Sequence, residues 1–359
     1  MRIVLSNASV KWGGVHAVTE LLARGLVERG HEVTVFGAPD SALEQRMKDV
    51  VPFEPILHGM DLHPLALWRA GKALRRHRAQ VVVAMMKKDV RLTVPAAWAQ
   101  GIPSVVRYAN DRPLTGWIYD RLFFGFMPVL HIANSEATRA TLLASAGWLQ
   151  PSRIRVIHNG IDRRTIDSVG PRPLNLPANA LTIGFAGRLE TRKGLLDLMK
   201  AWAIIAEAVP KAHLVIVGEG PDEAEAKSIA GPSPRIHWLG YRTDVPAILH
   251  ALDIAVVPSH WEGFGMIAAE AMLAGVPVVA ARASSLPEIV EDGVHGRLVP
   301  PRDPEALAAA IIELALDPKT RTAMGIKARE RARTDFTAER MLDSYEEALQ
   351  QIVEQKQTC

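Results

Sequence analysis

The sequence predicts an α/β protein built from two Rossmann-like domains, and three observations support this. The chain has 359 residues, which is more than one domain usually holds and enough for two separate cores. Short β-type runs alternate with segments of helical periodicity, as is typical of parallel sheets covered by helices. The alternation is interrupted by the proline-rich stretch 170–177, which predicts a break between two domains.

The first domain is expected over 1–170. Its first strand is predicted at 2–5, followed by a loop that ends at Gly13 and Gly14. Apolar residues then recur at helical spacing as far as Gly30, which is expected to end the helix before a second strand. Further strands are predicted at 81–84, 104–107, 129–134 and 154–158. Their order in the sheet does not follow from the sequence.

A second alternation predicts another domain over 178–335. Strands are expected at 181–186, 213–217, 236–239, 254–257 and 276–280. A final helix is expected in 336–359. The sequence does not tell which domain it packs on, and packing back on the first domain is one alternative. Because ligands of open parallel sheets bind beyond the carboxyl ends of the strands, functional residues are expected in strand-to-helix loops facing a cleft.

Composition narrows the cellular setting. The single cysteine, Cys359, excludes a disulfide framework and favours a reducing cytoplasm. The apolar run at the N-terminus is too short for a signal peptide, and no run of eighteen apolar residues occurs. We therefore expect a cytoplasmic protein that does not span a membrane.

The net charge of +3 conceals an excess of basic residues in the first half. The densest basic segment is a predicted helix at 64–80, which would suit the inner face of an anionic membrane as a peripheral contact. The solvated face of an ordinary Rossmann helix fits equally well. The basic residues concerned are Arg69, Lys72, Arg75, Arg76 and Arg78. Nucleic acid is not expected as a partner, because the cluster lacks interleaved aromatic residues. The aromatic segment 117–127 is expected to be mostly core, with a lipid-facing loop or an acceptor wall as alternatives.

Two carboxylates stand eight residues apart after the strand 254–257. Glu262 lies in a loop and Glu270 on the predicted helix 264–274, about 12 Å away along a helix axis. The turn between them contains Gly263, Phe264 and Gly265, and would present backbone N–H groups at a helix N-terminus, which favours phosphate. On spacing alone, an ordinary corner with two glutamates is an equal alternative.

Basic and glycine residues follow two other strands of the second domain. Arg188 and Lys193 lie on the loop after 181–186, where they could clamp a diphosphate or form a solvated basic loop. Gly218 follows 213–217 and permits close approach of a ligand, although a lone G-x-G is weak evidence.

These segments follow the order and spacing of the retaining glycosyltransferase family 4, which the chain resembles over nearly its whole length. The resemblance rests on GR-(x4)-K-G at 187–194, VGEGP at 217–221, LGYRTDVPAILHALDIAVVPS at 239–259 and E-x7-E at 262–270. In the first domain it rests on the glycine loop, on RGHEVTVF at 29–36 and on the IANSEATR and RVIHNGID segments.

The resemblance implies a GT-B fold and transfer of a hexose, with retention, from a nucleoside-diphosphate sugar. The implied acceptor is a lipid-linked, glycolipid or polysaccharide-precursor molecule of cell-envelope or polysaccharide biosynthesis. A UDP-sugar is favoured over GDP-mannose, and neither a metal nor another cofactor is implied.

The resemblance also implies roles for single residues. Arg188 and Lys193 match the cations that contact the donor diphosphate. Glu270 matches the residue that takes the ribose hydroxyls, and Glu262 lies on the donor-sugar side. The other implied donor contacts are Gly13, Gly14, Gly218, Gly263, Phe264, Gly265 and Met266. The departing phosphate oxygen helps to deprotonate the acceptor, so a protein base is not required.

One segment departs from the family. Where many members carry a histidine after the strand matching 104–107, this chain reads RYAND. Asn110 or Asp111 is expected to bind a sugar hydroxyl there, or else to form a turn. His16, just past the glycine loop, is a further candidate. Two alternatives to a transferase stay open: a sugar-nucleotide epimerase of the same fold, and a catalytically inactive scaffold subunit.

Overall fold

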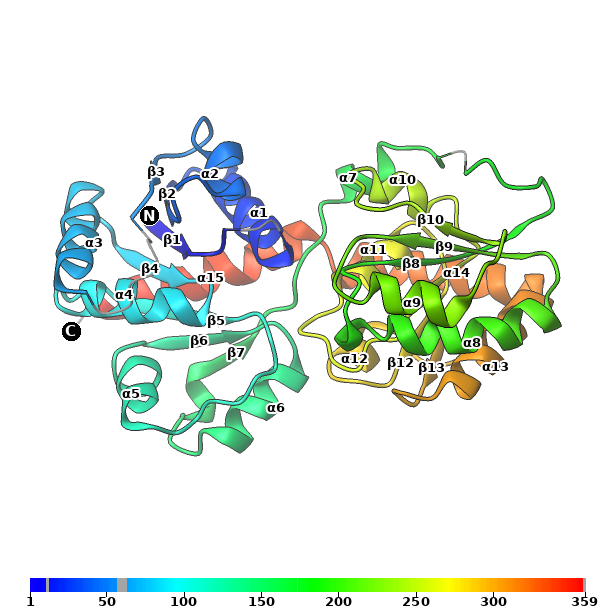
Figure 1. Ribbon diagram of the computed structural model, residues 1–359. Helices are drawn as coiled ribbons and strands as arrows, with labels where there is room; N and C mark the ends of the chain where they lie inside the picture. Colours follow the sequence, from blue (N-terminus) through cyan, green and yellow to red (C-terminus); the bar gives the residue numbers. More distant parts are fainter. Residues whose placement is uncertain (11–12, 57–62, 173, 358–359) are drawn as a thin grey trace. The chain divides into compact units, whose positions relative to one another are not determined.

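The computed structural model describes residues 1–10, 13–56, 63–172 and 174–357. The chain forms two compact units (Figure 1), one made of Met1–Gly160 with Ala338–Cys359 and the other of Ile161–Thr337. Each unit contains its own parallel sheet, as the alternation of strands and helices predicts. Cys359, on which the argument about disulfides rests, lies outside the described residues.

The first unit is built on a seven-stranded parallel sheet of order β3-β2-β1-β4-β5-β6-β7. The strands are β1 (Arg2–Asn7), β2 (Glu32–Gly37), β3 (Phe53–Glu54), β4 (Val81–Ala84), β5 (Ser104–Tyr108), β6 (Leu130–Ala133) and β7 (Ile154–Val156). The helices are α1 (Gly14–Glu28), α2 (Ala42–Met47), α3 (Pro64–Arg76), α4 (Lys87–Trp98), α5 (Ile118–Asp120), the π-helix η1 (Arg121–Phe126), α6 (Glu136–Ser145), the 3-10 helix η2 (Pro151–Arg153) and α15 (Ala338–Gln357).

Helix α15 belongs to the core of the first unit, where it packs against α1 (Figure 1). The Leu342 side chain occupies the space above Gly25, where a Cβ would lie 2.3 Å from it. Arg29 and Glu346 form an ion pair at 2.8 Å across the same contact. Of the two placements open for the final helix, the structure has the one on the first unit.

The second unit is built on a six-stranded parallel sheet of order β10-β9-β8-β11-β12-β13. The strands are β8 (Leu181–Ala186), β9 (Ala212–Val217), β10 (Ile236–Trp238), β11 (Ile254–Val257), β12 (Val278–Ala281) and β13 (Gly296–Val299). The helices are α7 (Arg163–Asp167), the 3-10 helix η3 (Thr191–Lys193), α8 (Leu195–Ala208), α9 (Glu223–Ala230), α10 (Val245–Leu249), α11 (Met266–Leu273), α12 (Leu286–Ile289), α13 (Pro304–Leu316) and α14 (Pro318–Asp335). Helices α8 and α13 share one core with the sheet, and α11 and α14 share another.

The boundary between the units is earlier than the prolines predict. Ile161 and Ile166 are buried in the core of the second unit, and the Ile161 amide donates to the carbonyl of Phe336 at 2.8 Å. Leu174 and Leu176 pack against the same core. The stretch 170–177 is thus attached to the second unit, because its leucines are apolar enough to be held there although its prolines prevent regular structure.

The aromatic segment 117–127 is only partly core. Phe123 and Phe124 are buried, whereas Trp117, Ile118 and Phe126 are 71%, 76% and 66% exposed. The expectation that most of it is buried is wrong, because the segment lies at the surface and only Phe123 and Phe124 join a core cluster.

Candidate functional site

The loop after β8 is held close to the end of β11. Gly194 is the N-cap residue of α8, with φ +73, and a Cβ at this position would lie 1.9 Å from the carbonyl oxygen of Pro258. A residue with a side chain would push the two loops apart. Gly194 therefore lets the basic residues of one loop meet the carboxylate of the other, although the two loops are far apart in the sequence.

Lys193 and Glu262 are brought together by this contact. The Lys193 ammonium pairs with Oε1 of Glu262, which also accepts a hydrogen bond from Ser259 Oγ at 3.0 Å. Arg192 Nη1 lies 3.9 Å from Oε2 of the same carboxylate. Glu262 is 5% exposed, so each partner compensates for the burial of the other's charge. Lys193 is thus not an uncommitted cation in the structure, as a diphosphate clamp would suggest.

Arg188 is the more accessible of the two predicted cations. Its side chain is 65% exposed, and its Nε lies 3.4 Å from Oε2 of Glu190. A pair this exposed contributes little to stability. The guanidinium is therefore able to leave Glu190 for an anionic ligand at small cost.

Sequence reasoning missed four residues near the predicted ones: Arg192, Asp197, His260 and Trp261. Arg192 lies over the ring of Trp261, 5.1 Å from its centroid, and pairs with Glu190 at 2.6 Å. His260 Nε2 bonds the carboxylate of Asp197. Arg192 and Trp261 are next to Lys193 and Glu262 in the sequence, and this position is the one signal that could have pointed to them. The pairing of His260 with Asp197 has no such signal.

Gly218 has a packing role in the structure. It has φ +128, and a Cβ would lie 1.9 Å from the carbonyl oxygen of Gly187. Its amide donates to the carbonyl of Gly240 at 2.8 Å. The glycine therefore joins the loops that follow β8, β9 and β10, and the direct contact with a donor expected of it stays a prediction.

The turn before α11 leaves the N-terminus of this helix open. Gly265 is the N-cap residue, with φ +87, and has no side chain with which to cap the helix. Helix α11 begins at Met266, two residues later than predicted, and its first turn contains no acidic residue. The Ala268 amide donates to the carbonyl of Gly265 at 2.9 Å, whereas the Met266 and Ile267 amides precede this first bond, and the helix dipole favours an anion near them. Phe264 is buried and packs edge-on against Phe336, with ring centroids 5.7 Å apart, so only its backbone is suited to contact a ligand.

Glu270 lies one turn farther along α11. The side chain is half-buried, and burial raises the pKa of its carboxyl to about 7. Within the part of the chain that the structure describes, no group donates a hydrogen bond to this carboxyl. A carboxylate with both oxygens uncommitted can accept two hydroxyl donors, which is the contact that a ribose offers.

In the first unit, Gly13 is the N-cap residue of α1 and Gly14 is its first residue, and both are exposed. A Cβ at either position would meet none of the described atoms within 4 Å. Neither glycine is therefore required there by the packing of the described residues, and close approach of a ligand remains an interpretation.

His16 faces inward. It is 1% exposed, its Nε2 lies 3.0 Å from the carbonyl oxygen of Ser9, and burial lowers its pKa. The ring joins the start of α1 to the loop before it, and the expected contact with a sugar or acceptor stays a prediction.

Asn110 and Asp111 follow β5, with Asn110 exposed and Asp111 half-buried. Asn134 Nδ2 donates to the carbonyl of Ala109 at 3.0 Å and so holds this segment next to the end of β6. Both residues thus lie at the carboxyl edge of the sheet, where parallel sheets bind ligands. Their contact with a sugar stays a prediction.

Among the described residues, no group of three or more His, Cys, Asp and Glu side chains could hold a metal ion. No helix in the described ranges is both long and apolar enough to cross a bilayer.

Comparison with known proteins assigns both halves of the chain. Residues 12–165 match the model of Glycosyltransferase Family 4, and residues 171–331 match that of Glycosyl transferases group 1. Two consecutive stretches of the chain thus match glycosyltransferase domain models, and the two parallel-sheet units have the GT-B fold.

Individual relatives agree with the family models. A glycogen synthase of Mycobacterium tuberculosis is 36% identical over 191 residues, which is 52% of this chain and 45% of the relative. A D-inositol 3-phosphate glycosyltransferase of Mycolicibacterium gilvum is 36% identical over 208 residues, 53% of this chain and 45% of the relative. The chain thus spans about half the length of the curated relatives it matches. The crystal structure of HepE from Anabaena with UDP and glucose has a TM-score of 0.85 at 23% identity, and the match covers 98% of this chain and all of that one.

Proposed function

We propose that this protein transfers a hexose, with retention, from a nucleoside-diphosphate sugar. The premise is that two stretches of the chain match glycosyltransferase domain models. The observation that carries the proposal is the uncommitted carboxylate of Glu270 one turn into α11, a helix whose N-terminus is open. The helix N-terminus is suited to bind a diphosphate, and Glu270, one turn later, is suited to accept hydrogen bonds from a ribose.

The donor is a UDP-sugar, with GDP-mannose as the second choice. HepE of Anabaena, which has the same fold, has been solved with UDP and glucose and with UDP-glucose. Melting curves with UDP, GDP, ADP and TDP test the base, because a ligand that binds the native protein raises its melting temperature. A shift with GDP and none with UDP would exclude the UDP-sugar.

The diphosphate is contacted by Arg188 and Lys193 and by backbone amides of Gly263, Gly265 and Met266. Lys193 must exchange its contact with Glu262 for one with phosphate, and Arg192 beside Glu262 lowers the cost of that exchange. Glu262 then accepts hydrogen bonds from the donor sugar. Positive charge at the diphosphate favours the transition state, because negative charge develops there as the leaving group departs.

The transfer follows a front-face path. The bond between the anomeric carbon and the diphosphate oxygen breaks, the acceptor oxygen forms its bond on the same face, and the acceptor proton passes to the departing phosphate. Neither a protein base nor a metal ion is needed in this scheme. Transfer that persists in EDTA supports it, whereas activity restored only by Mg²⁺ or Mn²⁺ would contradict it.

The acceptor is a lipid-linked, glycolipid or polysaccharide-precursor molecule of the cell envelope, and the protein works as a peripheral protein on the cytoplasmic face of a membrane. Helix α3 supports this, because it exposes Leu65 and Trp68 beside its cations, and Lys72 lies over the Trp68 ring at 5.3 Å. Exposed aromatic and basic side chains together bind anionic bilayer surfaces.

Turnover without an acceptor separates the proposal from the epimerase alternative. A transferase releases sugar slowly by hydrolysis, whereas an epimerase converts the nucleotide sugar with no acceptor present. An inactive scaffold would bind UDP and show neither reaction with any acceptor.

A further inference from the structure

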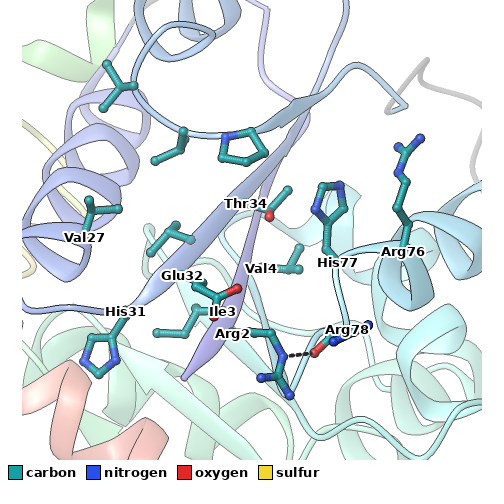
Figure 2. Close-up of a pocket in the computed structure, with 14 residues that line it drawn as sticks. Arg2, Ile3, Val4, Val27, His31, Glu32, Thr34, Arg76, His77 and Arg78 are labelled. Atoms are coloured by element: carbon teal, nitrogen blue, oxygen red, sulfur yellow. Dashed lines mark hydrogen bonds between the residues drawn. The ribbon is translucent and has the colours of Figure 1, made fainter.

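A cavity of about 600 Å³ lies in the first unit at the amino ends of β1 and β2 (Figure 2). Arg2 is the first residue of β1 and Glu32 the first of β2, and they are neighbours across the ladder. The glycine loop and Asn110 lie beyond the carboxyl ends of the strands. The cavity is thus at the opposite edge of this sheet from the predicted acceptor residues, and its volume suits a small ligand.

Two arginines line this cavity, and one of them donates a hydrogen bond to the backbone of the other. Arg2 Nε donates to the carbonyl oxygen of Arg78 at 2.7 Å, as Figure 2 shows. Neither guanidinium forms an ion pair with a carboxylate among the described residues, whereas the neighbouring Arg76 and His77 are both paired with Glu54. A guanidinium group that forms no ion pair can donate charge-assisted hydrogen bonds to a phosphate.

The backbone at Arg78 is a second and independent indication. Arg78 follows the end of α3 with φ +47, a left-handed conformation in which glycine is the usual residue. Keeping a large charged side chain at a strained position is typical of functional sites. The conformation of Arg78 therefore places a cation where helix termination alone would favour glycine.

The rest of the lining is suited to a different part of the same ligand. Glu32 and Thr34 carry a carboxylate and a hydroxyl between the arginines and the valines of the wall (Figure 2). The carboxylate repels a bare phosphate but accepts hydrogen bonds from hydroxyl groups. The two histidines of the lining already contact carboxylates: His77 pairs with Glu54, and His31 pairs with Glu346 at 2.9 Å.

We propose that this cavity, the Arg2–Arg78 pocket, binds a phosphorylated polyhydroxy compound of the sugar phosphate class. The phosphate is held by Arg2 and Arg78, the hydroxyls by Glu32 and Thr34, and the ring rests on the apolar wall that includes Val51. The pocket is separate from the nucleotide-binding residues and does not depend on the proposed transfer reaction.

Isothermal titration of the full chain with glucose 6-phosphate, with inorganic phosphate as the comparison, tests the pocket. The double variant Arg2→Gln/Arg78→Gln is expected to bind glucose 6-phosphate at least about tenfold more weakly, because it loses two charged contacts. The matched control Arg121→Gln removes one exposed cation of the same unit outside the pocket, and is expected to bind like the wild type. Equal affinity of the double variant and the wild type, or no binding by the wild type, would overturn the proposal.

Glu32→Gln tells a sugar phosphate site from a plain anion site. This variant is expected to bind glucose 6-phosphate about fivefold more weakly, since a charged hydrogen-bond acceptor becomes neutral, and to bind inorganic phosphate more tightly. Tighter binding of both ligands by this variant would overturn the assignment to a hydroxyl-bearing compound.

Two further measurements separate this site from the nucleotide site. The double variant should keep the wild-type melting temperature and its shift with UDP, which shows that it is folded and that its loss is local. Arg78→Lys keeps a charge and should recover part of the binding. Loss of glucose 6-phosphate binding in Glu270→Ala, with retention in the double variant, would place the ligand in the nucleotide site and overturn the proposal.

Discussion

Replacing Glu270 by glutamine is expected to stabilise the unliganded protein at alkaline pH while weakening nucleotide binding. Burial raises the pKa of the Glu270 carboxyl from 4.5 to about 7. Between these values the folded protein binds more protons than the unfolded chain, so the free energy of unfolding falls as the pH rises, and the full cost is present above pH 7. One pKa unit corresponds to about 1.4 kcal/mol, so the cost at pH 8 is about 3 kcal/mol. Below 4.5 the carboxyl is protonated in both states and the cost disappears.

Thermal melts of the wild type and Glu270→Gln at pH 5 and pH 8 measure this cost. At pH 8 the transition of the second unit should rise by up to roughly 6–12 °C, at 2–4 °C for each kcal/mol, and at pH 5 by less than about a third of that. The variant should also bind UDP at least about tenfold more weakly, because the ribose loses a charged acceptor. Glu207→Gln, an exposed carboxylate on α8, is the matched control and should change neither quantity by much. The same shift at both pH values, or none at pH 8, would refute the argument from burial.

Three further predictions concern other residues. Lys193→Met alone should destabilise the second unit by about 3–5 kcal/mol in urea denaturation, because Glu262 stays buried without its main partner. The double variant Lys193→Met/Glu262→Gln should regain most of that stability but should not regain transfer activity. Full recovery of transfer activity would contradict the role of Lys193. Gly194→Ala should lower the melting temperature, since its Cβ would lie 1.9 Å from a carbonyl oxygen, whereas Gly14→Ala should melt like the wild type and lose only turnover. Unchanged melting of Gly194→Ala would contradict the close approach of the two loops. Neutralising three cations of α3 should weaken binding to phosphatidylserine vesicles, measured by cosedimentation, by about 1 kcal/mol for each cation. Equal binding of the wild type to neutral vesicles would count against a charged membrane contact. These cations are Arg69, Lys72 and Arg75.

Periodicity and turn residues predict most of the second unit. The strands predicted at 181–186 and 254–257 are β8 and β11 in the structure. These elements are local, because apolar spacing, glycine stops and β-branched runs act within a few residues of each other. The candidate loops follow for the same reason, since each comes directly after a buried strand.

Contacts between segments far apart in the sequence could not be predicted in this way. Lys193 meets Glu262 because β8 and β11 are neighbours in the sheet and Gly194 allows the loops to touch. Nothing local indicates that pairing, and the two residues therefore suggest separate ligand contacts when each is considered alone. His16 is a similar case, since its inward orientation depends on the carbonyl of Ser9.

The sequence by itself determined the α/β class, the two parallel-sheet units and the loops in which candidate residues lie, because each depends on patterns shorter than one helix or strand. Only the tertiary structure decided that 161–177 belongs to the second unit, that α15 joins the first, and that Glu270 lies in surroundings that raise its pKa. These outcomes depend on which apolar surfaces meet and which charges lose water. Both are properties of the packed chain as a whole, and no single segment contains them.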